Sequence, residues 1–564
     1  MGSEGQQLSA SVVILLLVLF FGGTMFMSVM ISKKKENADG YMTAGQKIGF
    51  GMSAASMTAT WIWASSMYAS ATSGYAYGIS GPIHYGLWGA LMILFIYPFG
   101  RRIRQVAPKA HTLAEVMYAR HGRSSQLMLA GSNVLGSLIS LTSNFIAGGA
   151  LVALLSPFSF TQGIVVMAAG VLLYTLWSGF RASVLTDFAQ VLAMLGAVVV
   201  IIPVVFFAAG GPSMFETGAH NLTPQQSNFF SSEAFLSQGA PYIAAVLAYA
   251  IGNQTIAQRL FAVREDLIKP TFITATIGYG ATVIGIGMFG VMALYLGLEP
   301  MNGDSNNIIP QMATTYLGPV LLCVFFIMII GALCSTADSD LAALSSIMMA
   351  DVYGQNVAGH KKANPRTMLF VGRVTMIIAT GAALYFASGQ MNILDLLVFV
   401  GALWGALVFP VIASFYWNKV TNAAFTVAAL AAMVLFIPVR FEMLPENMAI
   451  NIGVDVLSTI GVGVVLGLMA FGFFGLRTAK WVAGVSIVVS APFVIGFLHD
   501  YHVLSGSLVA YAVSAVVCCL MSFRSNKDFD FALLKERTGN FDSEEKVEKA
   551  QETAKSGDDT APAN

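Results

Sequence analysis

Long apolar runs separated by short polar segments repeat along the chain as far as residue 523. A membrane-spanning helix needs about 20 mostly apolar residues, and most of these runs reach that length. We therefore expect an all-α polytopic membrane protein with about 15 transmembrane helices. The expected spans are 8–31, 50–76, 81–99, 126–155, 161–179, 184–208, 239–256, 272–297, 319–349, 367–387, 393–416, 421–438, 451–475, 480–498 and 503–523.

The basic residues test this span count, because cytoplasmic loops are enriched in Lys and Arg. If the N-terminus lies outside and the spans alternate, 28 of the 29 Lys and Arg residues lie at the inner side. Only Arg440 lies at the outer side. We expect a multi-pass protein of the plasma or inner membrane with a cytoplasmic C-terminus. Residues 1–523 would form the membrane domain, and the polar tail 524–564 would be disordered.

Composition excludes several classes of protein. Apolar residues make up 56% of the 564 residues, charged residues make up 10%, and the formal net charge is zero. Soluble domains carry roughly 25% charged residues, so an ordinary soluble enzyme is excluded, and a neutral chain is unsuited to nucleic acid. The four cysteines have no metal-ligand spacing, and neither a phosphate-binding loop nor a nucleophile–base pattern is present. We expect no organic cofactor and no enzymatic activity.

The span Ser53–Gly74 is unusually polar, reading SAASMTATWIWASSMYASATSG. Small and hydroxyl residues allow a membrane helix to unwind and re-satisfy its backbone groups. Trp61 and Trp63 lie near its middle, away from the interfaces where Trp is enriched. Two interpretations are open. The segment is either a small-residue packing face or a broken helix whose free carbonyls bind a cation beside a solute pocket.

Acidic residues inside spans are costly to bury and therefore indicate function. Asp338 and Asp340 lie in the span 319–349, and on a helix they point about 200° apart, so they need not share a site. Alternatively, the helix ends there and the acids reach cytoplasmic water, an interpretation that has more weight for Asp340. Asp187 either pairs with Arg181 or lies at the interface, or it faces the Asp338 helix as a cation ligand.

These segments together resemble the sodium/solute symporter family over roughly residues 47–417. The most specific match is CSTADSDLAALSS at Cys334–Ser346. LWSGFRASVLTDFAQ at Leu176–Gln190 and NQTIAQR at Asn253–Arg259 also match the family's elements. The segments TWIWASSMYASATSGYAYGISGP at Thr60–Pro82 and AHTLAEVMYARHG are similar to the urea and polyamine symporter branch.

The resemblance implies a five-plus-five inverted-repeat, LeuT-like core with repeats near 48–208 and 239–417. It implies a coupling Na⁺ held by three backbone carbonyls and two hydroxyls, those of Trp61, Ala64, Ala332, Ser335 and Thr336. It also implies a second cation or proton site, at Asp187, Ser335, Asp338 and Ser339. Members with this second site have serine where this chain has Asp338. The extra carboxylate either strengthens the cation site or carries a proton.

The resemblance places a solute pocket beside the sodium site, with Trp61, Trp63, Ser66 and Asn253 as candidates. In the sugar-transporting branch an aromatic residue stands two positions after the Asn253 equivalent, whereas this chain has Thr255. A Trp-lined pocket bearing an amide suits urea or another small amide, or an amine held by cation–π contact. We expect sodium-coupled symport of such a solute. The alternatives are a proton-coupled symporter, a uniporter or channel, and a transporter of another metabolite such as a carboxylate or amino acid.

Overall fold

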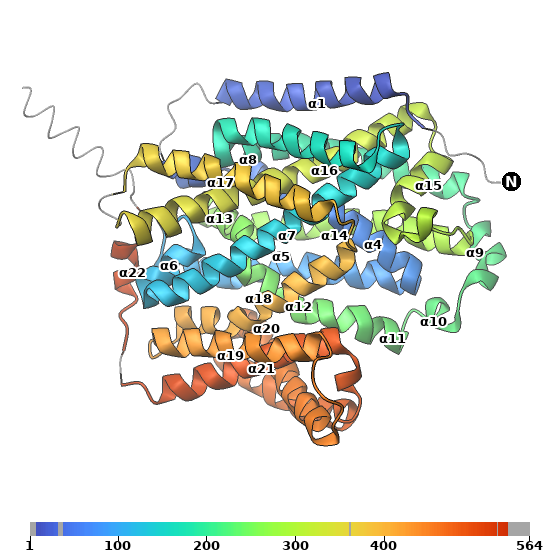
Figure 1. The fold of residues 1–564 in the computed structure, drawn as a ribbon. Helices are drawn as coiled ribbons and strands as arrows, with labels where there is room; N and C mark the ends of the chain where they lie inside the picture. Colours follow the sequence, from blue (N-terminus) through green and yellow to red (C-terminus); the bar gives the residue numbers. More distant parts are fainter. Residues whose placement is uncertain (1–6, 32–37, 360–362, 527, 540–564) are drawn as a thin grey trace, which may run out of the picture.

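The computed structural model describes residues 7–31, 38–359, 363–526 and 528–539. The described residues form a bundle of helices that run side by side along one direction (Figure 1). They contain no strand, and Ile48 and Val263 form an isolated β-bridge. This confirms the predicted all-α membrane fold.

The helices alternate with short connections. Their bounds are α1 Ala10–Ile31, α2 Ala38–Thr43, α3 Phe50–Trp61, α4 Ala64–Tyr77, α5 Ser80–Val106, α6 Leu113–His121, α7 Arg123–Leu155, α8 Phe160–Ala208, α9 Ser213–Thr217, α10 Pro224–Ser227, α11 Ser232–Ala234, α12 Ala240–Gly252, α13 Gln254–Ala262, α14 Ile268–Tyr295, α15 Ile308–Tyr316, α16 Pro319–Ser346, α17 Pro365–Ala387, α18 Ile393–Tyr416, α19 Asn422–Arg440, α20 Met448–Val494, α21 His502–Phe523 and α22 Ala532–Arg537. A π-helix, Ile347–Val357, continues α16.

Twelve helices among the described residues are long and apolar enough to cross a membrane. Some of the remaining or longer helices contain a break, so the number of membrane spans depends on whether each is counted as one span or two. The 47-residue α20 has a non-helical glycine at Gly475, and the 49-residue α8 has one at Gly179, with φ of 80° and 57°. The pair α3 and α4 is a single span broken near its middle. The total of about 15 therefore stays a prediction, since it depends on how these helices are divided.

Two helix breaks shape the centre of the bundle. Between α3 and α4, Ile62 and Trp63 leave the helical region, with ψ of 70° and 145°. Between α12 and α13, Asn253 has ψ of 119°. Both breaks are fully enclosed by neighbouring helices. A break leaves backbone carbonyls and amides without helical partners. These polar groups are therefore available inside the bundle to bind side chains or a ligand.

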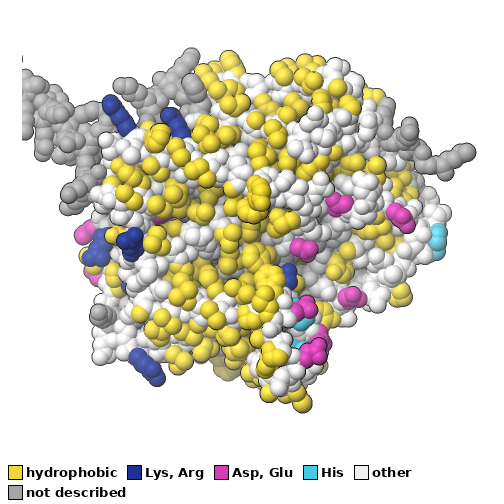
Figure 2. Space-filling model, viewed as in Figure 1, with side chains coloured by type: hydrophobic (Ala, Val, Ile, Leu, Met, Phe, Trp, Pro, Cys, Tyr) yellow, Lys and Arg dark blue, Asp and Glu magenta, His cyan; other side chains and the backbone are white. Residues whose placement is uncertain are grey.

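Charged side chains separate toward opposite ends of the bundle. Most Lys and Arg visible in Figure 2 lie toward the end at which α6, α13 and α22 lie in Figure 1, here called the basic end. Asp, Glu and His gather toward the opposite end, near α9, α10 and α11. The helix surfaces between the two ends are largely apolar, as a bilayer requires.

Candidate functional site

The break between α3 and α4 faces α16 at its two central hydroxyl residues. Ser335 Oγ lies 2.9 Å from the Ala59 carbonyl, and Thr336 Oγ1 lies 3.2 Å from the Thr60 carbonyl. Both hydroxyls also lie near the Ala332 carbonyl, at 3.0 and 3.3 Å. Five neutral oxygens from two helices therefore meet at the last turn of α3. Such a set suits a hard monovalent ion.

The predicted sodium ligands lie in this region with a different carbonyl pairing. Ala332 and the two hydroxyls come together, whereas the α3 carbonyls that meet the hydroxyls belong to Ala59 and Thr60 rather than to Trp61 and Ala64. The break sets this register, because α3 ends at Trp61 and its final carbonyls lack helical donors. The sequence indicated the broken segment, but it held no marker for which carbonyls would turn toward α16.

The predicted second cation site surrounds a buried guanidinium. Arg259 Nη2 lies 2.9 Å from Asp187 Oδ2 and donates to Ser339 Oγ at 2.6 Å. Its Nε donates to Ser56 Oγ at 3.0 Å. Asp187 therefore pairs with Arg259 of α13, a partner 72 residues away in the chain.

Asp338 belongs to the same cluster but takes its hydrogen bonds from hydroxyl groups. Ser183 donates to Oδ1 at 2.6 Å and Tyr174 donates to Oδ2 at 2.9 Å, while Ser339 Oγ lies 3.2 Å from Oδ1. Asp338 and Asp340 are both buried, and α16 continues past them to Ser346. The alternative in which the helix ends at these acids and exposes them to water is therefore wrong.

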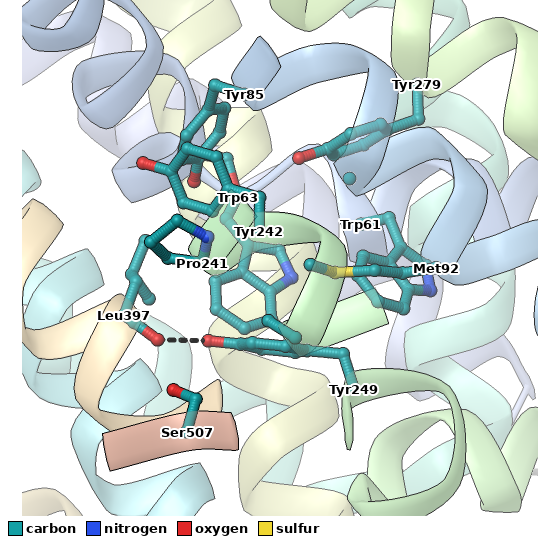
Figure 3. A pocket seen from close by; sticks show the side chains of 13 residues that line it. Trp61, Trp63, Tyr85, Met92, Pro241, Tyr242, Tyr249, Tyr279, Leu397 and Ser507 are labelled. Atoms are coloured by element: carbon teal, nitrogen blue, oxygen red, sulfur yellow. Dashed lines mark hydrogen bonds between the residues drawn. The ribbon is translucent and has the colours of Figure 1, made fainter. Parts of the chain in front are cut away.

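An aromatic pocket lies beside the break (Figure 3). The lining residues are Trp61, Trp63, Ser66, Tyr85, Gly89, Met92, Pro241, Tyr242, Ala245, Tyr249, Tyr279, Leu397 and Ser507. The Trp61 and Trp63 rings are stacked with centroids 6.4 Å apart, and Tyr249 contacts both. The Tyr249 hydroxyl donates to the Leu397 carbonyl at 2.6 Å.

Two polar groups of the pocket are buried without a hydrogen-bond partner among the described residues, Trp61 Nε1 and the Tyr242 hydroxyl. Ser66 lies against the hydroxyls of Tyr85 and Tyr279. A buried donor without a partner is costly, so these groups suit a polar ligand. The pocket thus offers aromatic faces together with a small number of hydrogen-bonding groups.

The sequence identified only part of this pocket. Trp61, Trp63 and Ser66 line it, whereas Asn253 caps α13 by accepting from the Thr255 amide at 2.8 Å. The tyrosines from α5, α12 and α14 were not predicted. They stand singly in apolar helices, where no local pattern distinguishes a pocket residue from a packing residue. Arg259 was visible only as part of a family motif.

At the basic end, a segment far along the chain packs against α6. Residues 528–539, here called the C-terminal strap, include α22 and lie in the predicted tail, while 540–564 lie outside the described residues. The Arg120 guanidinium carbon lies 4.0 Å from the centre of the Phe529 ring. Arg120 also donates to the carbonyls of Ser414, Trp417 and Asn418.

The strap ends at a buried acid on α6. The Gly539 amide donates to Glu115 Oε1 at 2.6 Å, and the His111 amide donates to Oε2 at 2.9 Å. Burial alone would raise the pKa of Glu115, but the hydrogen bonds from the His111 side chain and the two amides outweigh it and hold the pKa below its usual value. The buried Glu115 is thus kept ionised by donors from both segments.

Comparison with known proteins places this geometry in a family. The family model described as the sodium:solute symporter family matches residues 41–435. "Probable urea active transporter 1" of Schizosaccharomyces pombe is 22% identical over 76% of this chain and 69% of its own length. "Urea-proton symporter DUR3" of Oryza sativa subsp. japonica is 21% identical over 68% of this chain and 58% of its own length. "Sodium/pantothenate symporter" of Escherichia coli is 27% identical over 70% of this chain and 82% of its own length.

Solved structures show the same fold. A Na⁺-coupled sialic acid symporter in a substrate-bound outward-open state superposes with a TM-score of 0.60 and 18% identity. The match covers 86% of this chain and 98% of that one. This likeness confirms the predicted LeuT-like fold. Because the family model spans most of the chain and the relatives are carriers of solutes, the chain belongs to the sodium:solute symporter family and is a membrane transporter rather than an enzyme.

Proposed function

We propose that the protein is a sodium-coupled symporter of a small organic solute that works by alternating access. The meeting of the Ser335 and Thr336 hydroxyls with the last carbonyls of α3 carries this proposal. Carbonyls at a broken helix end attract a cation, because the C-terminal end of a helix is electronegative. A sodium ion at this point would hold α3 against α16.

The ion and the solute would be coupled through one segment. Trp61 ends α3 next to the ion ligands and also lines the aromatic pocket. A sodium ion that fixes the end of α3 would therefore also fix the position of the Trp61 ring. The solute would bind more tightly to the sodium-loaded form, and release of sodium toward the cytoplasm would release the solute. Each charge moved inward gains about 2.3 kcal/mol per 100 mV of membrane potential.

The pocket suits a small planar amide, with urea as the favoured solute. The Trp61 Nε1–H and the Tyr242 hydroxyl would hydrogen-bond with polar groups of the solute, and aromatic faces would cover the flat molecule. Among the pocket-lining residues there is no carboxylate, which disfavours a highly charged polyamine. The urea-transporting relatives support the same solute.

The expected topology puts the basic end in the cytoplasm, because loops rich in Lys and Arg face inward. The N-terminus would lie outside and the C-terminal strap inside, in a plasma or inner membrane. Labelling of single cysteines introduced at each end, with a reagent that does not cross membranes, tests this orientation.

Uptake of labelled urea into proteoliposomes tests the proposed function. We expect accumulation above equilibrium only with an inward sodium gradient. The Ser335→Ala and Thr336→Ala variants should lose the sodium effect. Thr459→Ala is a matched control, because this threonine is also buried and also donates to a carbonyl one turn earlier, but in the peripheral α20.

Each outcome separates one part of the proposal. Urea uptake that equilibrates without any sodium effect would contradict sodium coupling and favour a uniporter or a proton-coupled symporter. No urea uptake under either condition would contradict the solute, and a panel of amines, amides and carboxylates would then be tested. Sodium-driven uptake that survives both hydroxyl substitutions would contradict the ion site.

A further inference from the structure

The second cation site that the family resemblance implies is largely taken up by the protein's own groups. Its four expected ligands are Asp187, Ser335, Asp338 and Ser339. A hard cation such as Na⁺ needs several oxygens with lone pairs directed at one point. The Ser335 hydroxyl instead turns toward the Ala59 and Ala332 carbonyls, at 2.9 and 3.0 Å, and so belongs to the proposed sodium site.

The Arg259 guanidinium lies where the second ion would be held. Its Nη2 lies 2.9 Å from Asp187 Oδ2 and donates to Ser339 Oγ at 2.6 Å. A sodium ion at this place would have to bind the same carboxylate oxygen and the same hydroxyl. The guanidinium nitrogen therefore makes the contacts that the ion would make, and its positive charge repels a second cation.

The protein holds the Arg259 guanidinium in this position from several sides. Nε donates to Ser56 Oγ at 3.0 Å, and Nη1 donates to the Thr255 carbonyl at 3.2 Å. The guanidinium carbon lies 5.3 Å from the centre of the Phe180 ring, and the side chain is 4% exposed. All three nitrogens have acceptors, and an arginine keeps its charge at physiological pH. The site therefore contains a permanent cation.

Asp338, the second carboxylate of the cluster, is satisfied without a metal ion. The hydroxyls of Ser183 and Tyr174 donate to its two oxygens at 2.6 and 2.9 Å. Hydrogen bonds from hydroxyl groups stabilise the charge of a carboxylate. Asp187 Oδ1 has no hydrogen-bond partner among the described residues. This single oxygen is too little for a sodium ion, because hard cations need several oxygen ligands.

The Arg259 cluster adjoins the proposed sodium site through Ser339. The Ser339 hydroxyl donates to the Ser335 carbonyl at 2.5 Å and lies 3.3 Å from the Thr60 hydroxyl. Ser335 and Thr60 also belong to the proposed sodium site, through the hydroxyl of the first and the carbonyl of the second. A second sodium ion would therefore lie beside both the first ion and the guanidinium. The arrangement suits one mobile cation next to one fixed cation.

We propose that the Arg259 guanidinium takes the place of a second coupling ion, so that one sodium ion moves with each solute. This inference rests on the proposed sodium-coupled symport and fixes its stoichiometry. Through Ser56, Asp187 and Ser339, Arg259 joins α13 to α3, α8 and α16. A bound ion would make such contacts only while it is present, whereas the arginine makes them at every sodium concentration. One positive charge then enters with each neutral solute molecule.

Equilibrium binding of radioactive sodium to the purified full-length protein tests the number of ions without any solute. We expect one sodium ion per wild-type protein. Thr336→Ala should bind none over the concentration range that saturates the wild type. Two ions on the wild type, or one ion that remains on Thr336→Ala, would overturn the proposal.

Two substitutions of Arg259 separate its charge from its other contacts. Arg259→Gln removes the fixed cation, so the number of bound sodium ions should rise toward two. Arg259→Lys keeps a cation at this position and should keep the number at one. Arg264→Gln, which removes an exposed arginine, is the control and should also bind one ion. If Arg259→Gln is folded and still binds one ion, the proposal fails. If Arg259→Gln does not fold, the numbers for the wild type and Thr336→Ala decide.

Flux measurements in proteoliposomes test the stoichiometry during transport. Sodium is equal on both sides, and labelled urea is ten times more concentrated inside. If one charge moves with each urea, net urea movement should stop at about 59 mV, inside negative. Two charges per urea would move this point to about 30 mV, which would overturn the proposal and leave sodium-coupled symport intact. Urea flux without any sodium effect, or no urea flux, would contradict the proposed function, and the binding numbers would then decide the role of Arg259.

Discussion

The ion pair between Arg259 and Asp187 allows a quantitative test of the buried charge arrangement. The two side chains are 4% and 0% exposed, and Nη2 lies 2.9 Å from Oδ2. Replacing Arg259 with Gln leaves Asp187 as a buried charge without its cation. Removing one partner of a buried pair destabilises a protein by about 3–5 kcal/mol. Arg259 also donates to Ser56 and Ser339, so we expect a loss in the upper part of this range.

The opposite single variant should cost less. Asp187→Asn leaves the guanidinium within the field of a second carboxylate, Asp338, and we expect a loss of about 1–3 kcal/mol. The double variant, Asp187→Asn with Arg259→Gln, removes both charges of the pair and leaves Asp338 with its hydroxyl donors, and its two amides can bond to each other. Its loss should therefore be smaller than the sum of the single losses by about 2–3 kcal/mol.

The assay is the free energy of unfolding of the four full-length proteins in mixed detergent micelles. Arg264→Gln is the control, because this arginine pairs with Asp266 at an exposed site where both side chains are more than half exposed. An exposed pair contributes little, so the control should unfold like the wild type. Strictly additive losses for the two single variants would refute the inference that these charges depend on each other.

Three other substitutions test separate parts of the structure. Tyr242→Phe removes a hydroxyl that has no hydrogen-bond partner among the described residues, so the free energy of unfolding should not fall. The free energy of solute binding should weaken by about 0.5–1.5 kcal/mol. Equal solute affinities of the variant and the wild type by isothermal titration would argue against this donor. Gly179→Ala should destabilise by at least about 1–2 kcal/mol, because φ is 57° and the Tyr41 ring occupies the Cβ position; thermal unfolding at wild-type temperature would contradict this. The lowered pKa of Glu115 stabilises strap docking above its ordinary value of 4.5, and this contribution is lost as the pH falls through the folded pKa. Protease cleavage within the strap should therefore increase at acidic pH in the wild type, and Glu115→Gln should show less pH dependence.

The helical pattern could be predicted from the sequence because each span carries its own signal. Apolar length marks a span without reference to any other part of the chain, and the polar run around Trp61 marks the broken helix in the same way. The Asp187–Arg259 pair could not be found like this. Its partners are far apart in the chain, and the nearer Arg181 offered a plausible local partner.

The same limit applies to Asp340 and to the pocket tyrosines. The helical angle correctly separated Asp340 from Asp338, but burial depends on what α7 presents to it, and that is a tertiary property. Tyr242 and Tyr249 lie on an apolar helix whose face toward the pocket is fixed only when α5 and α18 pack around it. Sequence patterns identify elements, whereas the contacts between distant elements define the site.

The C-terminal strap has a consequence for biosynthesis. The Glu115 carboxylate and the Gly539 amide are 424 residues apart, so α6 leaves the ribosome long before its donor has been made. Until the strap arrives, Glu115 lacks one of its amide donors. Closure of the strap therefore requires translation at least as far as Gly539, and a protein truncated before Gly539 would lack this contact. A purification tag placed after residue 539 preserves this closure, whereas one inserted within 528–539 removes it.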